Sequence, residues 1–524
     1  MIAGFPGAAS RPPDITDAEL PPHSQDRLAM ASRAATGFVE ENPAGGFAVF
    51  ALIHFTLWTI LPTILYPNLP LDLIEATTYG REWQIGYDKL PPLPWWIVEI
   101  LYRLFHADIA YYAFSQITVL GALALVFRLA LPMTGALGAL ASVMIVDGLH
   151  YYTSTSPKFN HDVIQLPFWA LAGVAYFYAL RTGRLLHWML LGFALGMAFW
   201  AKYFVVILAF PLALFLLVDR DARPAMRTPG PYVAAAVALL VASPHLWWLV
   251  QNDFLPIHYV EARALPPQGF LDHIKRPLIF AFGQFAWSLP CLAIAASLFL
   301  PRSGKSEPYD VDRFSRRIVT LLTFGPMVTL LIAAAITGGK LIGMWGYPFW
   351  LFLGLWLVLR AGRIFDRARF AKLGWMWLIV TACYALAFVV DMAVIPRLSN
   401  SYRTELFPGN VVAAELAARF KTETGEPVRY VIGTMYDGGN VSHYAAEQPR
   451  NIIDGTFRRA PWIDPADVKR HGAVVVWLSG DPAHIPDMLR PLAGDAQPRP
   501  PLIVPRRVGK GEVSVGWAIV KPQP

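Results

Sequence analysis

Long uninterrupted apolar stretches dominate the hydrophobic pattern of this chain. Many of them are long enough, or nearly so, to cross about 30 Å of hydrocarbon as a helix. We expect eleven membrane spans, near residues 47–65, 109–131, 135–151, 163–180, 185–201, 203–218, 231–250, 277–300, 318–337, 345–359 and 373–395. The pattern therefore predicts a polytopic α-helical membrane protein with about 11–13 transmembrane helices over residues 46–398.

The two ends of the chain have a different pattern. Residues 1–45 are polar, rich in Pro and Ala, and lack the features of a cleavable signal peptide, so we expect a disordered tail. Residues 399–524 alternate between amphipathic and β-branched stretches, which predicts a small soluble α/β domain. Its elements are expected near 410–425 for a helix and near 428–436, 472–478 and 512–520 for strands.

The composition agrees with a membrane protein. The 524 residues are 55% apolar and 15% charged, and the mean hydropathy is +0.42. A soluble domain carries about 25% charged residues. The two cysteines, Cys291 and Cys383, both fall in apolar runs and form neither a disulfide framework nor a zinc motif. In a membrane protein, a net charge of +7 reflects Lys and Arg in the loops between the spans, and no nucleic acid partner is predicted.

The distribution of Lys and Arg predicts the orientation of the chain. Starting with a cytoplasmic amino terminus, the cytoplasmic loops are richer in Lys and Arg than the outer ones, as the positive-inside rule requires. They read "RLALPMTG", "RTGR", "DRDARPAMR", "RSGKSEPYDVDRFSRR" and "RAGRIFDRARFAK". With an odd number of spans, the domain at 399–524 is expected on the outer side.

The first outer loop, residues 66–108, carries an unusual density of charge beside lipid. A helix over "DLIEATTYGREW" would place Asp72, Glu75, Tyr79 and Glu82 on one side. Ordinary solvated loop charge is the alternative interpretation of these carboxylates. The following "PPLPWWIVEILYRLF" predicts an amphipathic interfacial helix anchored by its paired tryptophans.

Further polar residues of candidate function recur on the same outer face. Asp162 follows His161 at the start of a span, where helix capping is the alternative explanation. Several lysines could simply snorkel to the headgroups, yet together they suit a lipid-linked phosphate. The residues concerned are Lys89, Lys202 and Lys340, with Asn252, Asp253 and His258 after a later span. No metal-binding motif is found, and dependence on a divalent metal stays open.

These motifs resemble those of the GT-C superfamily. The order and spacing of residues in the first loop are similar to those of polyprenyl-phosphate-sugar-dependent glycosyltransferases, such as protein O-mannosyltransferases and lipid A aminoarabinose transferases. The matching residues are Asp72, Arg81, Glu82, Pro91, Pro92, Leu93, Trp95 or Trp96, Asp162, Lys202, Tyr203, Asn252 and Asp253. The resemblance covers residues 45–260 well. One departure is Leu73, where the family usually has a Glu after the catalytic Asp.

The resemblance implies an inverting transfer at the periplasmic face of a bacterial inner membrane. Asp72 would be the catalytic base, Glu75 is the alternative base, and Asp162 would orient the acceptor or hold a cation. Donor phosphate would meet Lys89, Arg81, Lys202 or Lys340. The acceptor pocket would include Tyr87, His161, Tyr203, Asn252, Asp253 and His258. The implied partners are a polyprenyl-phosphate-linked sugar, a lipid or glycan acceptor such as lipid A, and membrane lipids, with no firm cofactor.

Two other functions compete with this interpretation. A transporter or lipid flippase would place charged or broken helices at the membrane midplane, often in inverted repeats. Here the charges gather at one face. A non-enzymatic glycan-assembly factor would instead bind glycan through the domain at 399–524.

Overall fold

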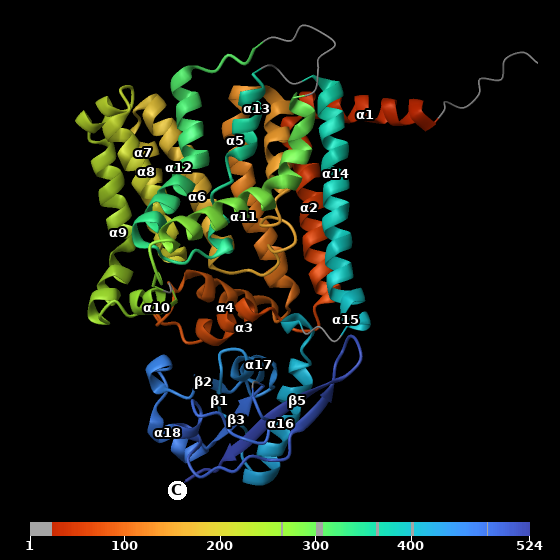
Figure 1. Cartoon of the computed structure of the whole chain (residues 1–524), viewed down its shortest axis with the longest axis vertical. Helices are drawn as coiled ribbons and strands as arrows, with labels where there is room; N and C mark the ends of the chain where they lie inside the picture. The colour runs from red at the N-terminus through yellow and green to blue at the C-terminus, as the bar shows by residue number, and fades with distance from the viewer. Residues whose placement is uncertain are drawn as a thin grey trace, which may run out of the picture.

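The computed structural model describes residues 24–263, 266–299, 308–362, 366–399, 403–478 and 480–523. A bundle of long helices forms one half of the molecule, and a separate α/β domain at the carboxyl end forms the other (Figure 1). Helix α1 lies at the end of the bundle that is farthest from this C-terminal domain (Figure 1).

The tail expected to be disordered over 1–45 is helical from Ser24 onward, so that prediction is wrong there. Helix α1 spans Ser24–Glu41 and is followed directly by α2, Pro43–Leu65. Val39 of α1 is buried, and Glu40 forms an ion pair with Arg367 at 2.5 Å. This packing holds the helix against the bundle. Residues 1–23 lie outside the described residues.

Seven of the described helices are long and apolar enough to cross a membrane. The polytopic helical fold is thereby confirmed. These spans are α2, α5 (Ile109–Asp147), α6 (His161–Thr182), α9 (Gly230–Gln251), α11 (Asp272–Ala295) continued by η3 (Ala296–Phe299), α12 (Arg313–Thr337), and α14 (Arg367–Val389) continued by η5 (Val390–Val394) and α15 (Ile395–Leu398). The other predicted runs correspond to shorter elements, namely α7 (Leu185–Ala201), η1 (Tyr203–Val205) with α8 (Val206–Val218), and η4 (Gly343–Gly346) with α13 (Leu353–Ala361). Element η2 (Arg223–Arg227) and α10 (Leu255–Arg263) flank α9.

Helix α5 consists of two antiparallel arms. The imidazole of His54 bonds Gln116 through Nε2 at 3.1 Å and Asp147 through Nδ1 at 2.7 Å. In a straight helix Gln116 and Asp147 would lie about 46 Å apart. The chain reverses at Gly135, whose φ of +70° lies in the region that glycine tolerates best. The sequence predicted this break as two runs, 109–131 and 135–151.

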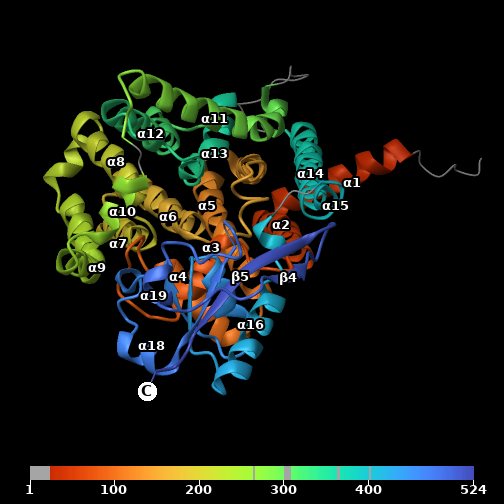
Figure 2. The ribbon, with the colours of Figure 1, turned by 60° about the horizontal axis from the view of Figure 1, so that its bottom comes forward.

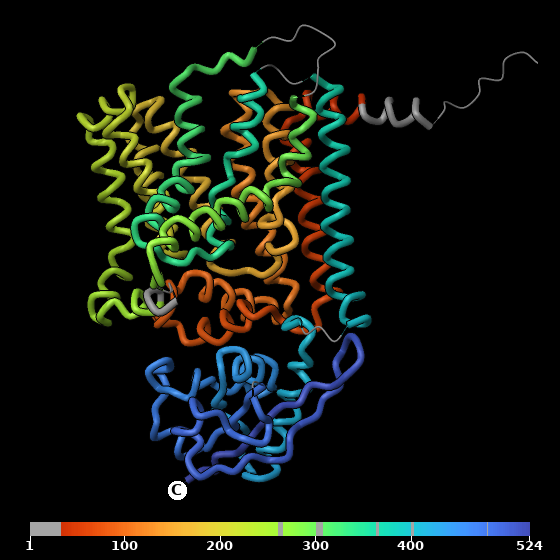
Figure 3. Tube along the Cα trace, in the orientation of Figure 1, coloured from red at the N-terminus to blue at the C-terminus, as the bar shows by residue number. Residues whose placement is uncertain are grey.

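The first outer loop forms two short helices between the bundle and the C-terminal domain. Helix α3 spans Leu71–Gly80 and α4 spans Leu93–Phe105. Figure 3 shows the chain leaving α2, passing through both helices, and returning into α5. Helix α17 of the C-terminal domain packs on α3. Trp95 was expected as an interfacial anchor, but it is 1% exposed because its ring packs against Tyr79 and His161.

The C-terminal domain has three layers around a five-stranded sheet of order β2-β1-β3-β5-β4. Strands β2, β1 and β3 are parallel, whereas β5 is antiparallel to both β3 and β4. One face packs on α16 and α17, the other on α18 and α19, so the central strands are buried at every position. The bounds are η6 Thr404–Leu406, α16 Gly409–Thr424, β1 Tyr430–Gly433, α17 Asp437–Tyr444, β2 Arg450–Ile453, η7 Phe457–Arg459, α18 Pro465–His471, β3 Ala473–Trp477, α19 Arg490–Ala493, β4 Leu502–Pro505 and β5 Glu512–Val520. Figure 2 brings this domain forward, over α3 and α4.

Candidate active site

A cavity of about 500 Å³ lies where the ends of the bundle helices nearest the C-terminal domain meet α3 and α4. Its polar wall comes from α3, the loop before α4, the start of α6 and the junction of α7 with η1. Its apolar wall comes from η1, α8 and η4. The lining residues are Asp72, Glu75, Ala76, Lys89, Leu90, Pro94, Trp95, Asn160, His161, Asp162, Lys202, Tyr203, Phe204, Val206, Ile207, Tyr259, Ile342, Met344 and Trp345. Seven of the residues singled out from the sequence therefore meet in one cavity.

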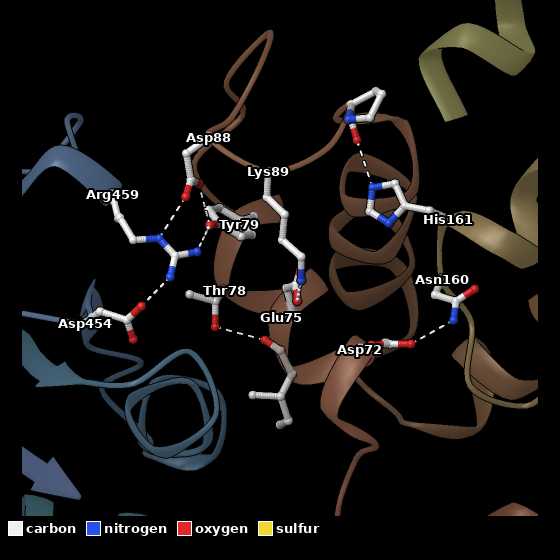
Figure 4. A network of polar contacts seen from close by, with 12 residues as sticks. Asp72, Glu75, Thr78, Tyr79, Asp88, Lys89, Asn160, His161, Asp454 and Arg459 are labelled. Carbon is white, nitrogen blue, oxygen red and sulfur yellow. Dashed lines mark hydrogen bonds and ion pairs between the residues drawn. The ribbon is translucent and has the colours of Figure 1, made fainter. Parts of the chain in front are cut away.

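Asp72 enters this cavity from the first turn of α3. One oxygen of its half-buried carboxylate accepts a hydrogen bond from Nδ2 of Asn160 at 2.7 Å (Figure 4). The same Asn160 amide caps α6, because its Oδ1 accepts from the N–H of Asp162 at 2.9 Å and of Val163 at 3.2 Å. No lysine or arginine of the described residues forms an ion pair with Asp72.

Glu75 lies one turn along α3 and is neutralised by Lys89. The Nζ of Lys89 lies 2.6 Å from Oε2 of Glu75 (Figure 4), and the Glu75 side chain is 8% exposed. Burial raises the pKa of Glu75, and the Lys89 ammonium opposes that rise. Burial lowers the pKa of Lys89, but Glu75, Tyr259 and Asp72 together outweigh it, so the net pKa of the lysine is raised. The ammonium therefore stays charged at neutral pH.

Asp162 and Lys202 form a second acid–lysine pair across the cavity. Their Oδ1 and Nζ atoms lie 2.6 Å apart, and Gln165 donates a further hydrogen bond to Asp162 at 3.1 Å. Lys202 is held there because it ends α7, where the chain turns into η1. The expectation that Asp162 and Asp72 lie on the same face is met, with Asn160 between them.

Aromatic and imidazole rings fix the walls around these charges. His161 bonds the carbonyl oxygen of Pro91 through Nε2 at 3.0 Å, and its ring meets the edge of Trp95. Tyr203 bonds Nε2 of His245 through its hydroxyl at 2.7 Å. Such contacts restrain the rings around the lysines and carboxylates that line the space.

Several predicted site residues lie outside the cavity. Arg81 was expected to bind donor phosphate, but it contacts the C-terminal domain, donating to Ser442 and to the carbonyl oxygen of Gln448, each at 3.0 Å. It follows Asp72 by nine residues, half a rotation around a helix, so it faces the other way. Glu82 was expected on the Asp72 face, but α3 ends at Gly80 and Glu82 pairs with Arg450 instead.

The remaining candidates also lie away from the main cavity. Lys340 is exposed in the turn before η4, and Asp253 and His258 are exposed at the end of α9 and in α10. Tyr87 and Asn252 line a separate crevice of about 260 Å³ between the bundle and the C-terminal domain. The sequence pattern could not separate these two spaces, because both lie at the end of the bundle next to the C-terminal domain.

Sequence reasoning missed Asn160 and Tyr259. An Asn directly before the "HDV" start of a span is a recognisable helix cap and could have been found. Tyr259 has no such signal. Its ring lies near the Lys89 ammonium, 5.6 Å from Nζ to the ring centroid, and this contact arises only from folding. The described residues contain no group of three or more His, Cys, Asp or Glu side chains arranged to hold a metal ion.

Comparison with known proteins finds similarity to glycosyltransferases. Residues 89–248 match the family model of dolichyl-phosphate-mannose-protein mannosyltransferases. The chain is 26% identical over 327 residues to lipid A galacturonosyltransferase RgtD of Rhizobium johnstonii. That alignment covers 60% of this chain and 66% of the relative, just under two thirds of its length.

Two crystal structures share the fold. ArnT from Cupriavidus metallidurans bound to undecaprenyl phosphate superimposes with a TM-score of 0.58 at 11% identity, covering 90% of this chain and 97% of that one. Its apo form gives 0.58 at 12% identity, covering 91% and 98%. The matched family model and the curated relative are both glycosyltransferases, and the chain shares its fold with ArnT, so it is similar to membrane glycosyltransferases of this type.

Proposed function

We propose that this protein is an inverting glycosyltransferase that moves a sugar from a polyprenyl phosphate carrier to a hydroxyl of lipid A or a related envelope glycolipid. The similarity to a lipid A galacturonosyltransferase supports the acceptor class. The fold shared with ArnT bound to undecaprenyl phosphate supports the donor class. The donor has an apolar tail and an anionic head, and the cavity has one apolar wall and one charged wall.

The observation that carries the proposal is the unequal pairing of the three cavity carboxylates. Glu75 and Asp162 each have a lysine within 2.6 Å, whereas Asp72 has the amide of Asn160. A carboxylate without a bound cation keeps its lone pairs available to accept a proton. This favours Asp72 over Glu75 as the base.

In the proposed reaction, Asp72 takes the proton from the acceptor hydroxyl as that oxygen bonds to the anomeric carbon. The bond between this carbon and the phosphate oxygen breaks at the same time, and the polyprenyl phosphate leaves with the electron pair. Lys89 and Lys202 stabilise the charge on the departing phosphate. A single displacement inverts the anomeric configuration.

The proposed location is the periplasmic face of a bacterial inner membrane, with the amino terminus in the cytoplasm. The concentration of Lys and Arg in the opposite loops supports this orientation. The separation of α1 from the C-terminal domain, at opposite ends of the bundle, is consistent with it (Figure 1).

Mass spectrometry of envelope lipids tests the proposal and names the sugar. Cells lacking the protein receive the wild-type chain, Asp72→Asn or Asp487→Asn. We expect one defined sugar mass on lipid A or a glycolipid to be present with the wild type and lost with Asp72→Asn. Asp487, an exposed carboxylate of the C-terminal domain, provides the matched control and should leave that mass in place.

Two results would overturn the proposal. Wild-type amounts of the sugar with Asp72→Asn, at equal protein levels, would remove Asp72 from the chemistry. Envelope lipids identical with and without the protein would remove the glycolipid acceptor.

A further inference from the structure

A second space adjoins the candidate active site. The crevice of about 260 Å³ lies between the outer end of α9, the loop before α4, and η7 of the C-terminal domain. It is lined by Gln84, Gly86, Tyr87, Asp88, Trp248, Asn252, Leu255, Arg458, Arg459, Pro461 and Trp462. Both domains are needed to form it.

Three elements connect this crevice to the main cavity. Asp88 lines the crevice and the next residue, Lys89, lines the cavity. On α10, Leu255 faces the crevice and Tyr259, one turn later, faces the cavity. The two spaces therefore lie on either side of the same segments.

An aromatic stack forms the third connection. The Tyr203 ring lines the cavity and lies nearly parallel to the His245 ring, with centroids 5.7 Å apart. The Trp248 ring, which lines the crevice, lies nearly parallel to the same His245 ring, with centroids 5.6 Å apart. A wall only a few side chains thick separates the two spaces, so a ligand in the crevice lies close to the donor cavity.

The crevice lining is chemically suited to a sugar. Trp248, Trp462 and Tyr87 give it aromatic surface, while the side chains of Asn252 and Gln84 offer amide groups. Saccharide pockets combine apolar ring surface with a few well-placed polar groups. The apolar wall that suits a polyprenyl tail belongs to the other cavity, at Val206, Ile207 and Met344.

The charges of the crevice favour an anionic ligand. Arg459 is already bound, because its Nε donates to Asp88 at 2.7 Å and its Nη1 pairs with Asp454. Arg458 is exposed, and no side chain among the described residues pairs with its guanidinium. Asp88 and Asp454 are both bound to Arg459, which leaves the Arg458 guanidinium available to a ligand. Guanidinium groups bind phosphate and carboxylate well.

We infer that this crevice binds the anionic saccharide headgroup of the acceptor lipid, with Arg458 contacting its phosphate or carboxylate and Trp462 contacting the sugar. The inference rests on the proposed function, because it assigns the acceptor's place beside the donor cavity. It makes η7 of the C-terminal domain a determinant of acceptor specificity.

Binding of lipid A by the full-length chain in detergent, measured by native mass spectrometry, tests the inference. The probes are bisphosphorylated lipid A and the same lipid with its phosphates removed. We expect Arg458→Ala to weaken binding of the bisphosphorylated form about fivefold or more, Arg458→Lys to recover part of it, and the dephosphorylated form to respond less. Arg490→Ala is the matched control, since Arg490 is an exposed arginine of the same domain outside the crevice.

Binding of the donor lipid distinguishes failure of this inference from failure of the proposed function. Binding of undecaprenyl phosphate should be equal in wild type and Arg458→Ala. If the wild type binds lipid A and Arg458→Ala, and separately Trp462→Phe, bind it equally well, the inference fails while the proposed function stands. If the wild type binds undecaprenyl phosphate but not lipid A, both the crevice assignment and the lipid A acceptor fail. Equal weakening of the phosphorylated and dephosphorylated forms would overturn the anionic contact.

Discussion

The Asn160 side-chain amide has two different roles. Its Nδ2 donates to Asp72, and its Oδ1 caps α6 by accepting from the N–H groups of Asp162 and Val163. Asn160→Ser separates these roles, because serine caps helices well but is too short to reach Asp72. We expect the variant to fold normally and to lower the turnover rate about tenfold or more, since a hydrogen bond to a charged group is lost. Initial rates in membranes, with the donor saturating, measure this.

The control for this prediction is Asn160→Ala, which removes the cap as well. It should lower both turnover and thermal stability, whereas the serine variant should lower turnover alone. A serine variant with wild-type turnover would mean that the position of Asp72 does not depend on Asn160.

Asp437 of the C-terminal domain should make the free energy of unfolding depend on pH. Burial raises its pKa to about 6, although hydrogen bonds from Thr434 and the N–H of Leu478 oppose that rise. The folded state then holds a proton that the unfolded state has released, so stability contributed by protonated Asp437 falls as pH rises from about 4 through 6. Asp437→Asn should remove this loss, about 2–3 kcal/mol at pH 7.5.

Thermal unfolding of the full-length protein at several pH values measures the effect. The asparagine variant should unfold at a higher temperature than the wild type at pH 7.5, and the two should converge near pH 4. Equal differences at both pH values would show that the carboxyl does not titrate in this range.

Among the structural elements, η7 and α3 are joined by a charge clamp next to the cavity. Arg459 donates to Asp88 at 2.7 Å and to the Tyr79 hydroxyl at 3.1 Å, and that hydroxyl donates to Asp88 at 2.6 Å (Figure 4). Lys89 follows Asp88 directly. Arg459→Ala should therefore let the lysine move, raising the donor KM about tenfold with a smaller change in kcat. Steady-state kinetics with varied donor measures this split.

Arg450→Ala provides the matched control for the clamp. Arg450 also joins the C-terminal domain to the first loop, but it pairs with Glu82, on the far side of α3 from the cavity. It should leave the donor KM unchanged. Equal KM increases in both variants would mean that general loosening of the domain contact, and not the position of Lys89, explains the effect.

The elements were largely predictable from periodicity, and the exceptions have physical causes. The runs at 109–131 and 135–151 were separable because "LPMTG" breaks the apolar pattern, and the chain does reverse at Gly135. Strands β2 and β4 were missed because each is short and, unlike β1, does not lie within a longer β-branched run, and β4 also lies in a proline-rich stretch. In α1, docking against the bundle overrides a composition that suggested disorder.

The site was predictable only in its residue types and in the gathering of its charges at one end of the bundle. Asp72 and Asp162 were expected at one level, and Asn160 joins them. The pairing of Glu75 with Lys89 depends on how the loop before α4 folds back, which no local pattern encodes. The C-terminal domain's contribution was invisible for the same reason, since Arg459 lies 371 positions from Asp88.

The orientation of the entire chain is a final prediction, and ion pairs strengthen it. Arg181 pairs with Asp312 at 3.2 Å, Arg317 with Asp219 at 2.9 Å, and Arg367 with Glu40 of α1 at 2.5 Å. The arginine-rich loops and α1 therefore share the bundle end opposite the C-terminal domain, and the positive-inside rule places that end in the cytoplasm.

Glu41→Cys and Lys510→Cys, both at exposed positions, report the two ends. A membrane-impermeant maleimide applied to spheroplasts should label Lys510→Cys at once and Glu41→Cys only after lysis. The wild type, whose Cys291 and Cys383 lie within α11 and α14, is the background control. Labelling in the reverse order would put Asp72 on the cytosolic leaflet and contradict transfer at the periplasmic face.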